Sequence, residues 1–247
     1  MNSLKSVDLV VENLKDRQKL KDSRIHPISL LLARSTYERG AGFRGRLNWQ
    51  CNKTIVDALE FAFYEAFHNV QPTNKRYCLA VDVSGSMGFR IQNSCLTCSE
   101  AAAALSMAII RTEPHVTSVA FSDELVPLDW RKDMNLSEVV QNAKEITMGA
   151  TDCALPMLWA ERNEKLFDVH PFQALQQYRK RLGIPDAKLI VMGMVCTDFS
   201  IADPSDPNML DICGFDSSVP QLLVCIAAQI CCMNGKPFDV WKAKDFK

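Results

Sequence analysis

Oxygen-bearing side chains gather where an apolar stretch of the sequence ends. Residues 77–81 lead into Asp82, Ser84 and Ser86, which are spaced two residues apart. Gly85 leaves the chain free to bend, so that one carboxylate and two hydroxyls can face one point. Such oxygens suit Mg²⁺, Mn²⁺ or Ca²⁺ and give a thiophilic metal little reason to bind. The spacing predicts a hard-cation site at the end of a buried strand.

The elements that position this site alternate along the chain. Apolar residues at helical spacing predict helices, and short apolar runs predict strands. The predicted helices cover residues 8–22, 27–37, 54–67, 94–111, 136–146, 154–162 and 171–181, and the predicted strands cover 77–83, 116–121 and 188–195. This order favours an α/β fold with a doubly wound, mostly parallel sheet behind a helical segment. Ligands bind such sheets at the carboxyl ends of strands, where Asp82 lies.

The composition is that of an ordinary soluble globular protein, with 47% hydrophobic and 23% charged residues among 247. The longest apolar stretch has about twelve residues, fewer than the roughly twenty that span a bilayer, so no membrane partner is expected. The N-terminus lacks the apolar core of a secretory signal. We therefore expect a cytoplasmic protein, with the nucleus also open.

Ten cysteines would indicate disulfides in a secreted chain. Here most lie in apolar segments, as Cys78 does, so reduced and buried thiols are expected. Cys95 and Cys98 have the spacing of zinc ligands, but no second pair stands at a suitable distance. We predict no zinc site.

A cationic loop lies in the first part of the chain. Residues 1–76 carry 13 Lys and Arg against 8 Asp and Glu, a balance of +5, whereas the remainder has a balance of −6. Arg39, Arg44 and Arg46 are interleaved with glycines beside Phe43. This loop is the most plausible phosphate contact in the chain, and an ordinary solvated loop between helices remains the alternative.

A second group of oxygen ligands lies at residues 149–152, where Thr151 offers a hydroxyl between small residues. Together with the Asp-x-Ser-x-Ser loop, it resembles the metal-ion-dependent adhesion site of von Willebrand factor A-type domains. The resemblance implies that Asp82, Ser84, Ser86 and Thr151 hold a divalent cation, Mg²⁺ or Mn²⁺.

Several separate segments resemble, more narrowly, the Ro (SS-A) autoantigen ribonucleoprotein family. The segments 119–124, 149–160 and 211–216 are similar to its C-terminal A-type domain, and 26–27 with 42–49 are similar to the end of its ring of helical repeats, the TROVE module. The resemblance implies three parts: a helical segment at 1–70, an A-like domain at 71–221 and an unassigned tail at 222–247.

One departure from that family affects the metal site. Where the family has a central strand ending in Thr-Asp, this chain runs through residues 164–169 directly into His170. The strand is shortened and the third metal loop is missing, so we expect a partial site. Asp168 lies too far from the lost position to replace it. Asp123 and Asp152 are better candidates to replace it, because they lie on loops after a strand or beside Thr151. Capping a turn or a helix is the simpler role for each.

The resemblance implies a noncatalytic ribonucleoprotein component that binds small noncoding RNA of the Y RNA type and is associated with RNA quality control. A metal-dependent protein-interaction module, whose partner completes the coordination, remains the alternative. Phosphotransferases with an aspartate nucleophile use a second aspartate two residues on, where this chain has Ser84, and its histidines occur in no nucleophile motif. We therefore expect no enzyme.

Overall fold

The computed structural model describes residues 2–43, 46–92, 94–146, 149–160, 170–194 and 201–215. The chain divides into two compact units, and the division falls between Asp152 and Cys153. Each unit is described by itself. Within the described residues, no helix has the length and apolar character needed to cross a membrane.

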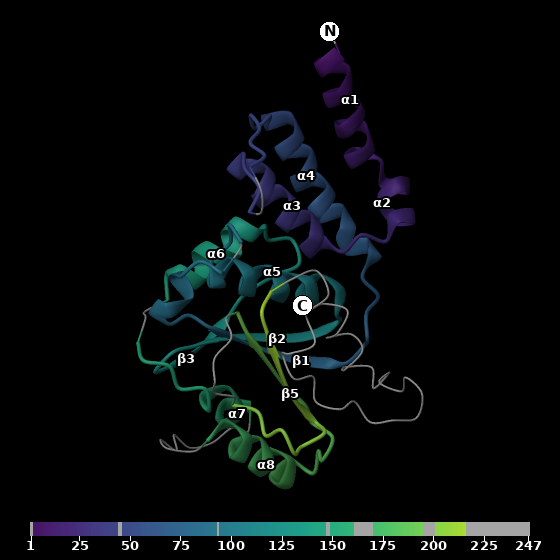
Figure 1. Cartoon of the computed structure of the whole chain (residues 1–247). Coiled ribbons are helices and arrows are strands. Elements are labelled where there is room, and N and C mark those ends of the chain that lie inside the picture. The colour runs from purple at the N-terminus through teal and green to yellow at the C-terminus, as the bar shows by residue number, and fades with distance from the viewer. Residues whose placement is uncertain are drawn as a thin grey trace. The chain divides into compact units, whose positions relative to one another are not determined.

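The first unit begins with four helices (Figure 1). They are α1 (Asn2–Lys15), α2 (Arg17–Ser23), α3 (Pro27–Arg39) and α4 (Lys53–Glu65), and α4 packs against both α1 and α3. The single helix predicted over 8–22 is wrong, because the carboxylate of Asp16 accepts hydrogen bonds from the backbone N–H groups of Gln18 and Lys19. This cap ends one helix and begins the next.

A three-stranded sheet follows the helices. Strand β1 (Arg76–Asp82) pairs in parallel with β2 (His115–Phe121), and β2 pairs antiparallel with β3 (Leu125–Leu128). Helices α5 (Cys98–Thr112) and α6 (Leu136–Lys144) complete this part. The predicted strands 77–83 and 116–121 are confirmed within one residue at each end, whereas β3 was not predicted.

Helix α5 begins four residues later than its predicted start at 94. Thr97 and Glu100 form a capping box in which each side chain accepts a hydrogen bond from the other residue's backbone N–H. The capping box fixes the start at Cys98. Most of the helix is buried, as its nearly uniform apolar sequence predicts.

The helical segment and the sheet share one unit because aromatic residues of α4 and η1 (Ala66–Asn69) contact α5 and α6. The guanidinium of Arg111 lies over the rings of Tyr64 and Phe67, at 5.0 and 5.1 Å from their centroids. The Tyr64 hydroxyl also accepts a hydrogen bond from the N–H of Leu136 at 3.0 Å. The predicted domain boundaries near residues 70 and 221 stay predictions.

The second unit has a smaller core. Helices α7 (Leu155–Ala160) and α8 (Pro171–Leu182) pack around Ala154 and Ala174, beside β4 (Leu189–Gly193) and its parallel neighbour β5 (Met209–Cys213). Strand β5 was not predicted. The α/β class is confirmed, and the described strands form one mixed and one parallel sheet.

Two cysteines contradict the prediction of reduced, buried thiols. Cys78 is exposed, because it lies on the face of β1 that also exposes Arg76 and Ala80. Cys213 takes part in a disulfide. Burial in an apolar segment was therefore inferred too broadly, since a strand buries its two faces unequally.

Candidate functional site

The loop after β1 brings the predicted oxygen ligands together. Strand pairing continues one residue beyond β1, since the N–H of Val83 donates to the carbonyl of Phe121 at 3.1 Å. The N–H of Ser84 then donates to Oδ1 of Asp82 at 2.7 Å, so the carboxylate turns back over the loop. The hydroxyls of Ser84 and Ser86 lie 3.1 Å apart.

These three side chains differ in exposure. Ser84 is only 5% exposed, Asp82 is half-buried and Ser86 is exposed. Gly85 opens a short 3₁₀ helix, η2 (Gly85–Gly88), which carries the Ser86 hydroxyl around the bend. The oxygen atoms of Asp82, Ser84 and Ser86 form a group, the oxygen cup, that is buried at Ser84 and open to solvent at Ser86. Such a cup can bind a hard cation that keeps some of its water.

The second predicted loop lies at the carboxyl end of β2. The N–H of Asp152 donates to the carbonyl of Ser122 at 2.8 Å, and Ser122 directly follows Phe121, the residue paired with Asp82. Thr151 is exposed beside this anchor. The two oxygen-bearing loops thus lie at the carboxyl ends of adjacent strands, where the fold class predicts ligand sites.

A further carboxylate lies against the second loop. A Cβ added at Gly149 would collide with the carboxylate of Asp123, so only glycine permits this approach. The hydroxyl of Ser122 donates to Oδ1 of Asp123 at 3.0 Å, which orients that carboxylate. Asp123 and Gly149 are distant in the sequence, which offered no signal for their contact.

The candidate cation ligands are hydroxyls and carboxylates that do not form one cluster. In the part of the chain that the structure describes, no three His, Cys, Asp or Glu side chains form a cluster that could hold a metal ion. Asp168 lies outside the described residues. A cation here would depend on Asp82, the three hydroxyls of Ser84, Ser86 and Thr151, and water.

The cysteine pair does not resemble a zinc centre. Cys95 and Cys98 are both free thiols, and Cys98 is buried at the start of α5. Burial raises the pKa of the Cys98 thiol, which disfavours the thiolate that zinc requires.

The cationic loop follows α3. Gly40 ends the helix in the left-handed conformation, with φ of 71°, and its carbonyl accepts a hydrogen bond from the N–H of Trp49 at 2.8 Å. The indole of Trp49 stacks on Tyr37 and donates to that residue's carbonyl at 2.9 Å. These contacts close the loop at its base.

The end of α3 and the loop after it display the cations. The guanidinium of Arg39 lies 4.2 Å from the ring centroid of Phe43, and both residues are exposed. Arg46 is also exposed, next to Leu47, which is 77% exposed. Arg44 lies outside the described residues. The structure therefore exposes two of the three predicted arginines, Arg39 at the end of α3 and Arg46 on the loop that follows.

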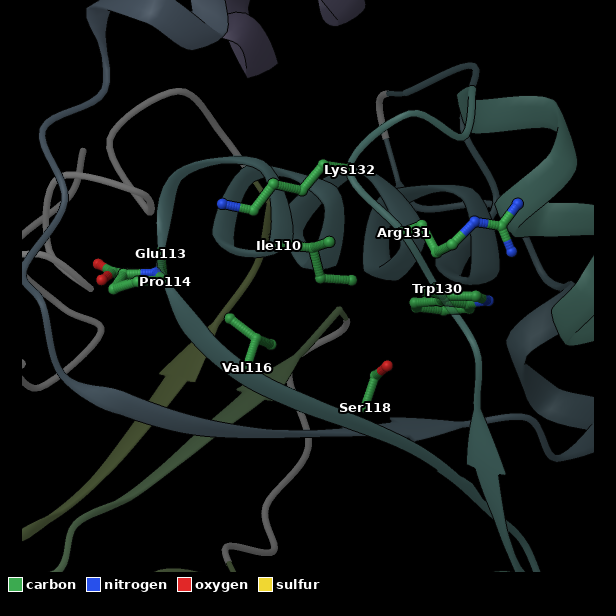
Figure 2. Close-up of a pocket in the computed structure, with 8 residues that line it drawn as sticks. All are labelled: Ile110, Glu113, Pro114, Val116, Ser118, Trp130, Arg131 and Lys132. Carbon is green, nitrogen blue, oxygen red and sulfur yellow. The ribbon is translucent and has the colours of Figure 1, made fainter.

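A cavity of about 270 Å³ is lined by residues of α5, β2 and the segment after β3 (Figure 2). Ile110, Val116 and Trp130 form its apolar walls, and Ser118 and Lys132 add polar groups. Val116 and Ser118 lie near the start and at the middle of β2, whereas the oxygen-bearing loops lie at the carboxyl ends of β1 and β2. The cavity is thus separate from the predicted cation site.

The comparisons with known proteins agree on one family. A family model described as the Ro60 vWA domain matches residues 76–226. The RNA-binding protein RO60 of Caenorhabditis elegans is 49% identical over 233 residues, which cover 89% of this chain and 36% of that protein. The protein of the same name from Deinococcus radiodurans is 41% identical over 242 residues, which cover 92% of this chain and 45% of that protein.

The solved structures include the crystal structure of the Deinococcus radiodurans RO (RSR) protein. It matches with a TM-score of 0.83 and 41% identity, and the match covers 91% of this chain and 48% of that one. The chain spans less than half the length of these relatives.

Proposed function

The chain belongs to the family of Ro60 vWA domains, and from this premise we propose that it binds RNA without catalysing a reaction on it. The observation that carries the proposal is the exposure of Arg39, at the end of α3, together with Phe43 and Arg46 on the loop that follows. The relatives named RNA-binding protein RO60 support the same ligand class. Small noncoding RNA of the Y type is the partner we propose, in the cytoplasm or also in the nucleus.

The chemistry of the loop suits a structured RNA with single-stranded parts. Guanidinium groups pair with phosphate oxygens in a bidentate manner, and an exposed aromatic ring offers a surface on which a base can stack. Phe43 already holds the guanidinium of Arg39 over its ring, which limits the rotamers that must be ordered on binding. The excess of positive charge in residues 1–76 adds attraction at longer range.

Direct binding of a labelled Y-type RNA to the purified full chain tests this function. We expect saturable binding that weakens as salt rises, and we expect a DNA duplex of equal length to bind more weakly at the same salt concentration. Equal affinity for the two nucleic acids, or no binding of either at low salt, would contradict the proposal.

We further propose that the loop after β1 holds one divalent cation, Mg²⁺ or Mn²⁺. The donor set fits a hard ion, because Asp82 supplies a carboxylate while Ser84, Ser86 and Thr151 supply hydroxyls. When bound, such an ion would neutralise the Asp82 carboxylate and offer open coordination positions to oxygen atoms of a ligand. Because the protein supplies few donors, only one of them a carboxylate, we expect the ion to bind weakly.

A Mn²⁺ titration of the full chain tests the cation site. We expect one weak site in the wild type and its loss in Asp82→Asn. That variant keeps an oxygen that can accept the Ser84 N–H, so the fold of the loop is retained while the charge is removed. Equal Mn²⁺ affinity in both proteins would contradict the assignment.

One observation favours a second function, cation-dependent capture of a protein. Phe89 is 73% exposed, and its N–H donates to the carbonyl of Ser86 at 3.1 Å, so an exposed apolar residue directly follows the loop that carries the oxygen cup. A partner carboxylate could complete the coordination while an apolar surface covers this ring. Capture of a protein that chelator and Phe89→Ser both abolish would support this function over RNA binding.

A further inference from the structure

The cavity drawn in Figure 2 has the size and the lining of a small-molecule site. Its described lining residues all belong to the first unit, and Ile110, Val116 and Trp130 give it apolar walls. Its volume of about 270 Å³ is slightly below the range of about 300–1,000 Å³ that holds drug-sized ligands. The cavity therefore suits a body no larger than one or two fused rings.

The acidic side chain of the lining is already occupied elsewhere. The carboxylate of Glu113 accepts hydrogen bonds from the N–H and the hydroxyl of Thr73, at 2.7 and 2.8 Å, and from the N–H of Asn74 at 2.9 Å. Figure 2 shows this carboxylate directed away from Ile110 and Val116. Three donors thus stabilise its negative charge on the segment before β1, outside the apolar part of the cavity.

The two cations of the lining differ in their partners. The guanidinium of Arg131 forms ion pairs with Asp129 at 3.2 Å and with Asp133 at 3.4 Å. Lys132 has no carboxylate within ion-pair distance in the part of the chain that the structure describes. Figure 2 shows its side chain extending past Ile110. Lys132 is therefore the cation that remains available to an anion in the cavity.

A buried hydroxyl lies on the other side of the apolar walls. Ser118 is only 7% exposed, and its hydroxyl donates to the carbonyl of Leu128 at 3.0 Å. A serine hydroxyl has one proton and two lone pairs, so this oxygen can still accept a hydrogen bond from a ligand. Figure 2 shows Ser118 and Lys132 on opposite sides, with Ile110 and Val116 between them. The cavity thus offers an acceptor on one side and a positive charge on the other.

We propose that this cavity binds a small aromatic carboxylate whose ring carries an N–H or O–H donor. The ring lies against Ile110, Val116 and Trp130, its donor bonds to the Ser118 hydroxyl, and its carboxylate meets the Lys132 ammonium. Each polar group of such a ligand gains a partner while the ring buries apolar surface. An indole or a phenol with a short acid side chain has this arrangement of groups.

A ligand-observed NMR titration of the full chain with indole-3-acetate tests the proposal. We expect saturable binding with a dissociation constant of about 0.1–1 mM, as for other ligands of about a dozen atoms. Indole-3-acetamide lacks the charge and should bind about five- to tenfold more weakly. Equal binding of the acid and the amide would overturn the proposal, and so would no binding of the acid at about 5 mM.

The variant Lys132→Gln identifies the cation. It should weaken indole-3-acetate about five- to tenfold and leave indole-3-acetamide unchanged, because only the acid meets the ammonium. Lys144→Gln removes the same charge from the exposed surface of α6 and should have no effect. Arg39→Gln should have none either, whereas it would weaken an aromatic anion that bound beside Phe43 instead. A loss with either control that equals the loss with Lys132→Gln would overturn the assignment.

The variant Ser118→Ala identifies the acceptor. It should weaken indole-3-acetate about fivefold and leave 1-methylindole-3-acetate, which has no ring donor, unchanged. Both ligands meet the same variant protein, so the comparison stays valid if the substitution lowers stability. An equal loss for both ligands would contradict the assignment of Ser118. Tighter binding of uridine 5′-monophosphate than of indole-3-acetate in the wild type would overturn the proposal, because the occupant would then be a nucleotide.

Discussion

The loop after β1 and the loop after α3 carry opposite charge and are held in different ways. In the first, Asp82 and Ser84 bond to each other across two residues, and the buried Ser84 anchors the cup. In the second, bonds at Gly40 and Trp49 close the base, while Arg39 and Arg46 extend into solvent. One loop gathers oxygen atoms around a point, and the other spreads cations over a surface.

This difference predicts that the two loops can be disabled separately. A cation site needs several donors fixed around a single ion, so it depends on local geometry. Contact with phosphates needs positive charge at suitable spacing and tolerates motion, so it depends on charge and salt. Changes at Asp82 should leave RNA affinity unchanged, and changes at Arg39 and Arg46 should leave Mn²⁺ affinity unchanged.

The largest effect is expected from reversing the charges of the cationic loop. Arg39→Glu combined with Arg46→Glu should weaken RNA binding about hundredfold at moderate salt, because two phosphate contacts become repulsive. A control with Lys21→Glu and Lys53→Glu changes the net charge equally on exposed parts of the helical segment. Filter binding that gives equal losses for both double variants would show that the loop has no special role.

A smaller effect is expected from removing the carboxylate of the oxygen cup. Asp82→Ala should lower the free energy of unfolding by about 1–2 kcal/mol, because the N–H of the buried Ser84 loses its acceptor. Asp82→Asn should retain most of this stability while losing Mn²⁺ affinity. Urea denaturation checks the first expectation, and Asp129→Ala, on an exposed carboxylate, provides the control. Equal stability of Asp82→Ala and the wild type would mean that the bond does not order the loop.

The stability of α3, the helix that leads to the cationic loop, should depend on pH through His26. His26 should give the oxygen cup no pH dependence. His26 caps α3 by accepting the N–H of Ile28 on Nδ1, and burial lowers the pKa of His26 from 6.5 to about 4. Between pH 6.5 and about 4 the unfolded chain therefore binds one more proton at His26 than the folded chain does. Stability from this cap is complete above pH 6.5 and is lost as the pH falls towards 4.

With allowance for solvent screening, the loss amounts to about 1 kcal/mol. His26→Asn retains a capping side chain that does not titrate. Unfolding measured at several pH values should show a steeper fall below pH 6.5 for the wild type than for this variant. Parallel curves would show that His26 does not contribute.

The smallest effect is expected from the cap of α5, which follows both loops in the sequence. Thr97→Ala should lower stability by about 1 kcal/mol, and Thr97→Ser should restore most of it. Neither RNA nor Mn²⁺ affinity should change. A change in Mn²⁺ affinity at equal stability would link the helix cap to the oxygen cup, which the separation of the loops does not allow.

Both loops could be found from the sequence because their members lie close together in it. Asp82, Ser84 and Ser86 span five residues, and Arg39, Phe43 and Arg46 span eight. The approach of Asp123 to Gly149 joins distant residues and depends on how β2 and the later loop fold together. Spacing carries no information about such a contact.

The missed elements were short or carried contrary signals. Strand β3 has four residues and an internal proline, which argues against a strand. Strand β5 contains the exposed Asp211, which interrupts its apolar run. Both strands form because a neighbouring strand offers backbone partners, and a partner is not visible in local sequence.

The salt dependence of RNA binding tests the central claim, that this chain contacts RNA phosphates through Arg39 and Arg46. The logarithm of the association constant for a Y-type RNA is measured against the logarithm of salt concentration. For the double variant Arg39→Ala with Arg46→Ala, the slope should be smaller than that of the wild type by about 2, one for each lost phosphate contact. Parallel lines for the two proteins would contradict the claim, whatever the change in affinity.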